Sequence, residues 1–350
     1  MKKLFLILLF CSLCYGESHY YLAPWGNDSG GDGSKANPWF TMTKADDSIG
    51  TDRPVYVHLA TGTYHYSTLQ TINTRTGTSE SNRIYYSGDI YGQFIGGFGG
   101  PDSVILDYDS ALVDAIYVRA GVQYITIENI FIVDTYGYGV GKGDFALIEG
   151  VDYINVINCG TDDQGTFFYT DEGPASTYNY FINCWITNGA QFIAYSRYTY
   201  FINCVVSDSL GSGVTLDGNA SNCKVLNCII SSPANYGLYY ANITSQESNY
   251  NFVGTGGTDF GYWNGSDLDF ASWKTTSGQD DKSVNNNDPL FDDVTHHKLK
   301  IGYTSAARNI GAGRANTSIP AIAGLDYYGR PRGQGSSDCG LHNITQGGIE

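Results

Sequence analysis

One short pattern, two apolar residues followed by Asn and Cys, recurs through the middle of the chain and decides its fold. Its copies are Val156-Ile157-Asn158-Cys159, Phe181-Ile182-Asn183-Cys184, Phe201-Ile202-Asn203-Cys204 and Leu226-Asn227-Cys228. The four Asn residues lie 25, 20 and 24 positions apart, and a weaker copy precedes them at residues 125–130. A unit that returns at such a period is typical of a solenoid, in which each repeat contacts only its neighbours.

A second short apolar segment, usually preceded by Gly, comes before each copy. These segments are residues 115–119, 146–149, 166–170, 193–196, 213–217 and 237–240. Two or three such strands per repeat form one coil that cannot bury its apolar face alone, so coils stack at about 4.8 Å. The sequence therefore predicts an all-β fold, a single-stranded right-handed parallel β-helix with a short N-terminal cap and an irregular C-terminal cap.

The repeated Asn and Cys residues are expected to stack in two columns. Buried amides are tolerable only when paired, so the Asn residues should form a structural ladder, each bonding the next coil. Four of the six Cys residues after residue 16 occupy one column. Adjacent coils lie within disulfide range and an exported protein permits disulfides, but side chains in register point the same way. We expect mostly free, buried thiols, and a straight column does not suit zinc.

Composition and charge limit the partners. Only 15% of the residues are charged, whereas Gly reaches 44 and Tyr 29, which favours strands and turns over helices. The formal net charge of −16 has no compensating Lys/Arg cluster, so a nucleic-acid partner is excluded.

Residues 1–16 have the features of a signal peptide. Lys2 and Lys3 precede an apolar stretch over residues 4–13, which is too short to span a bilayer. We expect a monomer that is secreted or held at the cell surface, with no membrane span. The predicted divisions are 1–16 signal peptide, 17–111 N-terminal cap and first coils, 112–255 central coils, and 256–350 C-terminal coil and capping region, which should shield the last edge strand.

Both ends of the chain carry motifs of a known group. Near the N-terminus these are Tyr20-Tyr21-Leu22-Ala23-Pro24-Trp25-Gly26-Asn27-Asp28 and Gly62-Thr63-Tyr64, and near the C-terminus Asp288-Pro289-Leu290-Phe291 and Asp326-Tyr327-Tyr328-Gly329-Arg330-Pro331-Arg332. In these motifs the chain resembles secreted right-handed parallel β-helix proteins of the pectate-lyase-like superfamily. The resemblance implies fold and export. It is less specific for activity, because the group includes polysaccharide lyases, other carbohydrate-active proteins and adhesins.

Proteins of this architecture act on the outside of one sheet, where side chains of adjacent coils form columns. Strand alternation assigns two outward columns here. One is Tyr117, Leu147, Phe168, Ala194, Thr215 and Tyr239, and the other is Arg119, Glu149, Thr170, Ser196 and Asp217. Aromatic faces beside polar groups suit a sugar, so Tyr117, Phe168, Asp217 and Tyr239 are the predicted substrate-binding residues.

Glu149, Asp171, Glu172 and Arg197 are the predicted catalytic residues. Paired carboxylates one coil apart suit glycoside hydrolysis, because like charges raise one pKa and supply a general acid. The alternative is that these are solvated surface charges that Arg197 neutralises.

A lyase acting on uronic acids needs a base and commonly calcium. Asp162 and Asp163 precede a strand where similar lyases carry an acidic turn, so we assign them as candidate calcium ligands, although Asp-Asp-Gln-Gly is also good turn chemistry.

Two functions remain open on the sequence. The first is an exported β-helix that binds or processes extracellular carbohydrate, as a polysaccharide lyase or a glycoside hydrolase, with a polysaccharide or a cell-surface glycan as partner. The second is a non-catalytic adhesin or surface structural protein, which the absence of a recognisable base motif favours.

Overall fold

The computed structural model describes residues 17–50, 54–89, 103–111, 114–135, 143–147, 150–162, 166–170, 177–189, 191–254, 259–286, 288–293, 298–313, 315–326 and 330–340. The predicted signal peptide lies outside these residues. None of the described helices is long and apolar enough to cross a membrane.

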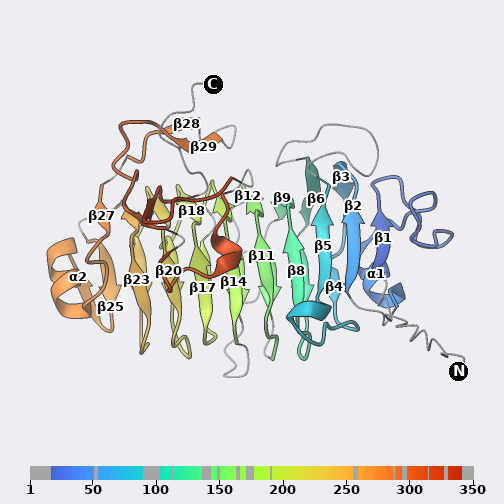
Figure 1. Cartoon of the computed structure of the whole chain (residues 1–350), viewed down its shortest axis with the longest axis horizontal. Helices are drawn as coiled ribbons and strands as arrows, with labels where there is room; N and C mark the ends of the chain where they lie inside the picture. The colour runs from blue at the N-terminus through green and yellow to red at the C-terminus, as the bar shows by residue number, and fades with distance from the viewer. Residues whose placement is uncertain are drawn as a thin grey trace, which may run out of the picture.

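Three long sheets run the length of the molecule, and the chain visits them in a fixed order (Figure 1). Sheet A contains β1 (Ser18–Leu22), β2 (Val55–Leu59), β5 (Ile84–Gly88), β8 (Ile125–Glu128), β11 (Asn155–Ile157), β14 (Asn179–Ile182), β17 (Thr199–Ile202), β20 (Lys224–Leu226) and β23 (Glu247–Asn249). Sheet B contains β3 (Gly62–His65), β6 (Val104–Ala111), β9 (Phe131–Thr135), β12 (Gly160–Thr161), β15 (Trp185–Ile186), β18 (Val205–Ser207), β21 (Ile229–Ser231), β24 (Phe252–Val253) and β27 (Val284–Asn285).

Sheet C completes each coil. It contains β4 (Gln70–Ile72), β7 (Ile116–Val118), β10 (Gly143–Leu147), β13 (Thr166–Thr170), β16 (Phe192–Ala194), β19 (Val214–Leu216), β22 (Leu238–Tyr240), β25 (Gly261–Trp263) and β26 (Ser266–Leu268). Only the last pair, β25 and β26, is antiparallel. Each successive coil adds one parallel strand to each sheet, so the chain forms the predicted right-handed parallel β-helix.

The predicted Asn ladder stands at the corner between sheets A and B. The side-chain amide of each Asn donates to the amide oxygen of the Asn in the preceding coil, over 3.1 to 3.2 Å, from Asn227 back to Asn129. All five residues have φ between 53° and 60°, a left-handed conformation that Asn adopts more readily than most residues. The ladder residues are Asn129, Asn158, Asn183, Asn203 and Asn227.

The corner between sheets C and A is built differently, and the sequence did not predict it. Tyr124, Tyr153, Tyr178 and Tyr198 all have φ between 52° and 58°. Their rings stack from coil to coil, with centroids 4.5, 5.3 and 4.7 Å apart. Ring stacking of this kind contributes about 0.5–1.5 kcal/mol per pair, which offsets the cost of a left-handed backbone at a residue other than Gly or Asn.

The cysteines among the described residues are free and buried, as expected. Cys159, Cys184, Cys204 and Cys228 form the inward column, and each thiol donates to the carbonyl oxygen two residues earlier over 3.4 to 3.5 Å. Burial raises the pKa of the Cys159 thiol to about 12, because the interior disfavours the thiolate. These cysteines therefore serve as small core side chains.

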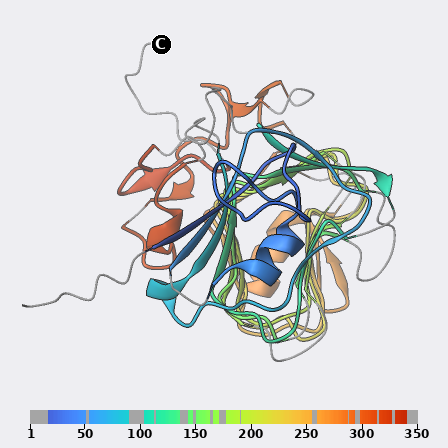
Figure 2. The same ribbon diagram turned by 90° about the vertical axis from the view of Figure 1, so that its right-hand side faces the viewer.

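Short helices close the two ends of the solenoid. At the N-terminal end, α1 (Met42–Ser48) buries Met42 and Ala45 across the opening of the first coil, as the view along the axis shows (Figure 2). At the other end, α2 (Phe270–Ser277) buries Trp273 against Tyr240 and Phe260. The indole Nε1 of Trp273 donates to Asp280, which is fully buried.

Residues 298–313, 315–326 and 330–340, which we call the C-terminal strap, turn back along the outside of the coils (Figure 1, red). The strap includes β29 (Lys298–Ile301), which pairs with β28 (Phe291–Asp293), and also β30 (Gly311–Ala312), a short 3-10 helix (Ala321–Ala323) and β31 (Ser336–Ser337). Its apolar side chains join clusters on the outer faces of sheets A and B: Ile319 and Ala323 belong to the cluster of Ile202, and Leu299 belongs to that of Trp185.

The strap also accepts hydrogen bonds from the Asn ladder. The amides of Asn183, Asn203 and Asn227 donate to the carbonyl oxygens of Leu325, Ala323 and Ala312 over 3.2, 3.2 and 2.9 Å. The buried guanidinium of Arg332 donates to Asn183 and to the carbonyl oxygens of Asp338 and Gly340. One column of amides therefore ties the coils to each other and to the strap.

We predict that Asn203→Ala lowers the free energy of unfolding by about 3 kcal/mol. About 1–2 kcal/mol is the cost of placing Ala in the left-handed region, and the rest comes from the buried groups of Asn183, Asn227 and Ala323 that lose their partner. The measurement is urea unfolding followed by circular dichroism.

Asn222→Ala is the matched control for that variant. Asn222 also has a left-handed backbone, with φ 55°, but its corner carries no ladder. Its replacement should cost only about 1–2 kcal/mol, which is the backbone contribution. Equal losses in the two variants would contradict a stabilising ladder.

Candidate functional site

The outer face of sheet C is the surface on which the sequence placed a substrate site, and its register differs from the predicted one. The column that contains Tyr117 continues through Ala146, Tyr169, Ile193, Thr215 and Tyr239 to Tyr262. The prediction is thus correct for Tyr117, Thr215 and Tyr239 and wrong in the three coils between them.

The three misplaced residues belong to the two columns that flank this one: Leu147 and Ala194 share the register of Val118 and Leu216, and Phe168 shares that of Phe192. Leu147 and Ala194 are fully buried, and Phe168 pairs with the buried Phe192. The register of Phe168 is therefore that of Phe192 and not that of Tyr117, and its substrate-binding role stays a prediction. The error has a physical cause: strands of three to five residues offer little alternation to fix the phase, and a slip by one residue exchanges the two faces.

The second predicted column is also broken. Ser196 is fully buried and its hydroxyl lies 3.0 Å from that of Thr199, while Thr170 pairs with the inward Leu147. Arg119 is exposed and its guanidinium lies 5.6 Å from the ring of Tyr117. The other predicted residues of this region, namely Glu149, Asp171, Glu172 and Asp163, lie outside the described residues.

Arg197 and Asp217 lie at the corner between sheets C and A, where the chain leaves sheet C. The Nε of the exposed Arg197 donates to the hydroxyl of Ser221 over 3.0 Å, which orients the guanidinium. It borders a polar depression of about 250 Å³. The other lining residues are Gly218, Asn219, Ala220, Ser221, Asn242 and Thr244. A guanidinium among amides and hydroxyls suits an oxyanion such as a carboxylate.

An aromatic group at the C-terminal end of sheet C completes the outer column. Tyr239 and Tyr262 stack with their centroids 4.5 Å apart and their planes at 8°. Burial raises the pKa of the Tyr239 hydroxyl, and the charges of Tyr262 and Asp217 add to the shift. The hydroxyl of neighbouring Tyr236 donates to Asp267 over 2.6 Å, and this bond raises the pKa of Tyr236 to about 12. Both hydroxyls therefore remain protonated donors at neutral pH.

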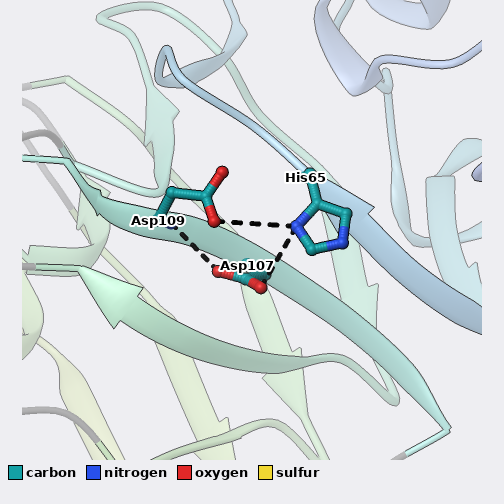
Figure 3. Close-up of side chains that lie close together, drawn as sticks. All are labelled: His65, Asp107 and Asp109. Carbon is teal, nitrogen blue, oxygen red and sulfur yellow. Dashed lines mark hydrogen bonds and ion pairs between the residues drawn. The ribbon is translucent and has the colours of Figure 1, made fainter.

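Carboxylates gather at the opposite edge of sheet C, where the chain enters it from sheet B. His65, at the end of β3, lies beside Asp107 of β6 in register, and its Nδ1 is 3.2 Å from that carboxylate (Figure 3). Asp109 lies 3.8 Å from the same nitrogen. Partial desolvation, and after it repulsion by Asp107, Asp162 and Asp109, raises the pKa of Asp134. We call these five residues the acidic corner.

Asp162 was predicted as a metal ligand, and the structure brings its charge next to that of Asp134. Sequence reasoning missed His65, Asp107, Asp109 and Asp134. The sequence does contain a signal for three residues of the acidic corner, because Asp109, Asp134 and Asp162 recur at the period of the coils. Both Asp109 and Asp134 have left-handed backbones, with φ 49° and 56°.

The acidic corner has donors for a divalent cation. One ligand atom from each of His65, Asp107 and Asp109 lies within 4.8 Å of the other two. Carboxylate oxygens suit calcium, which would use the aspartates, whereas an imidazole nitrogen suits a transition metal. Such an ion would neutralise the charge of an anionic ligand bound next to sheet C.

Comparison with solved structures shows the fold. A rhamnogalacturonan lyase matches with a TM-score of 0.54 and 14% identity, over 68% of this chain and 68% of its own. The GH136 lacto-N-biosidase from Eubacterium ramulus matches with a TM-score of 0.51 and 14% identity, over 68% of this chain and 52% of its own. Pectate lyase Pel9A matches over 94% of this chain and 97% of its own at 13% identity, but with a TM-score of only 0.41.

These proteins share the parallel β-helix with this chain, and identities this low show the fold alone. No protein-family model matches the sequence, and no curated protein matches it. The chain spans about half of the lacto-N-biosidase.

We predict that Asp134→Asn stabilises the protein at pH 7 in the presence of a chelator, by about 0.3 kcal/mol. The raised pKa means that the native state favours the protonated form, so the ionised carboxylate of Asp134 destabilises the native state above that pKa. The gain should disappear as the pH falls to about 3, because Asp134 is then protonated in both the native and unfolded states. Urea midpoints at the two pH values measure it.

Asp208→Asn is the control for this charge effect. Asp208 lies at the same type of corner, with φ 56°, but its contacts are with Ser207 and Ser231. A gain of the same size and pH dependence in both variants would show that repulsion in the acidic corner is not its origin.

Proposed function

We propose that this protein is exported and binds or processes extracellular carbohydrate along the outer face of sheet C. The observation that carries the proposal is the asymmetry of the solenoid surface. The C-terminal strap packs against the outer faces of sheets A and B, and sheet C takes no part in either of those apolar clusters. Among the described residues, Tyr117, Tyr239 and Tyr262 of its outer column are partly exposed and lie outside those clusters, whereas Tyr169 is buried.

The chemistry along this face suits a chain of sugar rings. The tyrosines of the column combine apolar rings with hydroxyl groups, as sugar binding requires. The acidic corner borders one edge of the sheet and the Arg197 depression the other, so a bound polysaccharide would meet a cation site on one side and a guanidinium on the other. An acidic polysaccharide has the carboxylates that both groups prefer.

Processing would require the carboxylates that the sequence assigned. Glu149, Asp171 and Glu172 flank β10 and β13 in the chain, so they are the proposed general acid and base, with Arg197 as the group that holds an anionic substrate. Their roles are inferred from position along the chain and from the chemistry of paired carboxylates.

A non-catalytic adhesin is the second candidate. It is favoured by the composition of the described outer column, which holds Tyr, Ile, Thr and Ala and contains no carboxylate pair. Such a surface binds sugar rings without a group for proton transfer.

Retention on a polysaccharide panel tests binding. We expect affinity electrophoresis to show binding to at least one acidic polysaccharide, weakened about tenfold or more by Tyr239→Ala with Tyr262→Ala. The double variant Tyr56→Ala with Tyr85→Ala is the matched control, because this pair stacks at 4.8 Å and 8° on sheet A. No retention on any polysaccharide, or equal losses in both double variants, would contradict the proposal.

Product analysis separates the two candidates. An enzyme releases unsaturated ends, if it is a lyase, or new reducing ends, if it is a hydrolase. Replacing Glu149, Asp171 and Glu172 together by amides should abolish release and leave retention intact. Retention without release from any bound polysaccharide, with and without calcium, assigns the adhesin.

Calcium binding has its own prediction. We expect calcium to raise the melting temperature of the protein and to strengthen retention of acidic polysaccharide, because binding to the native state alone stabilises it. Asp107→Asn with Asp109→Asn should remove both effects, whereas Asp208→Asn should keep them. A calcium effect that survives in the Asp107/Asp109 variant would place the ion elsewhere.

A further inference from the structure

The N-terminal loop presents a tryptophan to solvent from a rigid backbone. This loop lies beyond β1 at the end of the solenoid (Figure 1, dark blue at the right). A turn closed by Gly26 N–H and the Ala23 carbonyl has Pro24 and Trp25 at its centre, and 58% of Trp25 is exposed. Trp39, Trp185 and Trp273 are buried.

Hydrogen bonds hold the loop in this form. The carboxylate of Asp28 accepts from the backbone N–H groups of Phe40 and Thr41 over 2.7 and 3.1 Å, and the side-chain oxygen of Asn27 accepts from those of Ser29 and Gly30 over 2.9 and 3.1 Å. The loop is thus already ordered before a ligand binds, and this lowers the entropic cost of binding.

Trp25 forms one wall of a depression of about 200 Å³. The other lining residues are Asn27, Gly30, Gly31, Ala36, Asn37 and Pro38. No charged side chain is among them. Gly31 has no room for a side chain, because the carbonyl oxygens of Asn27 and Pro38 lie where a Cβ would be, so the loop backbone is closely packed below the depression.

The surroundings of Trp25 differ from those of the other surface rings. Tyr56 and Tyr85, like Tyr239 and Tyr262, pair face to face, so one face of each ring is taken by its neighbour. Among the ring contacts of the described residues, Trp25 takes part in none. A free indole face beside the carboxamides of Asn27 and Asn37 offers an apolar plane together with hydrogen-bonding groups that are neutral.

We propose that this depression binds one neutral sugar residue of a glycan, with a pyranose ring on the indole of Trp25 and its hydroxyls on the two carboxamides. A lining without charge offers no ionic partner to an acidic sugar, so it suits a neutral one better. The inference is independent of the site on sheet C, which lies along the side of the coils. It gives the protein a second carbohydrate contact at its N-terminal end.

Acrylamide quenching of tryptophan fluorescence tests the proposal on the full chain. The probes are methyl glycosides of glucose, galactose, mannose, xylose and N-acetylglucosamine, and their short oligomers, at millimolar concentrations. We expect at least one to reduce quenching saturably, because Trp25 is the most exposed indole, and Trp25→Ala to abolish that change. Affinity electrophoresis should show that Trp25→Ala lowers the affinity for that neutral glycan about tenfold or more. Trp25→Phe, which keeps an aromatic plane, should lower the affinity less.

Tyr303→Ala is the matched control, since Tyr303 is an aromatic side chain of similar exposure, 66%, in the C-terminal strap. It should leave both quenching and affinity unchanged. The proposal is overturned if no neutral sugar changes the quenching of the unmodified protein, or if Trp25→Ala binds as tightly as the unmodified protein. Because the tyrosine variants of sheet C leave Trp25 in place, failure at one site is distinguishable from failure at the other.

Discussion

The hydrogen-bonded column of Asn side chains is the interaction on which the rest of the structure depends. At each rung the left-handed backbone turns the chain from sheet A to sheet B, and the amide bonds the rung of the preceding coil. In the central coils the same amides donate to the strap. A buried side-chain amide whose N–H and C=O groups are both hydrogen-bonded stabilises the register of the coils. An amide without partners would instead destabilise the fold by its full desolvation penalty.

The strap that this column anchors decides which surface remains for ligands. Ile319, Ala323 and Leu299 cover apolar side chains that point outward from sheets A and B, so those faces serve as a second core. Sheet C lies opposite the ladder corner, and Tyr117, Tyr239 and Tyr262 of its outer column are partly exposed. The two apolar clusters under the strap thus draw on sheets A and B, whereas sheet C contributes its inward side chains to the central core.

The sequence was sufficient to predict the solenoid, the ladder and the buried thiols, because Asn158, Asn183, Asn203 and their Cys neighbours repeat at the period of the coils. It was insufficient for the outer face of sheet C, where short strands of five and three residues left the phase of Leu147 and Ala194 undetermined. The acidic corner was missed for another reason. His65 and Asp107 are 42 residues apart and meet only through the register of β3 and β6.

Hydroxyl-radical footprinting of tyrosines is the most direct measurement of whether sheet C is the ligand face. The protein would be labelled alone and with the polysaccharide that it retains most strongly. The account predicts protection of Tyr239 and Tyr262 on sheet C, and unchanged labelling of Tyr56 and Tyr85 on sheet A. Protection of the sheet A pair with unchanged labelling of the sheet C pair would contradict it.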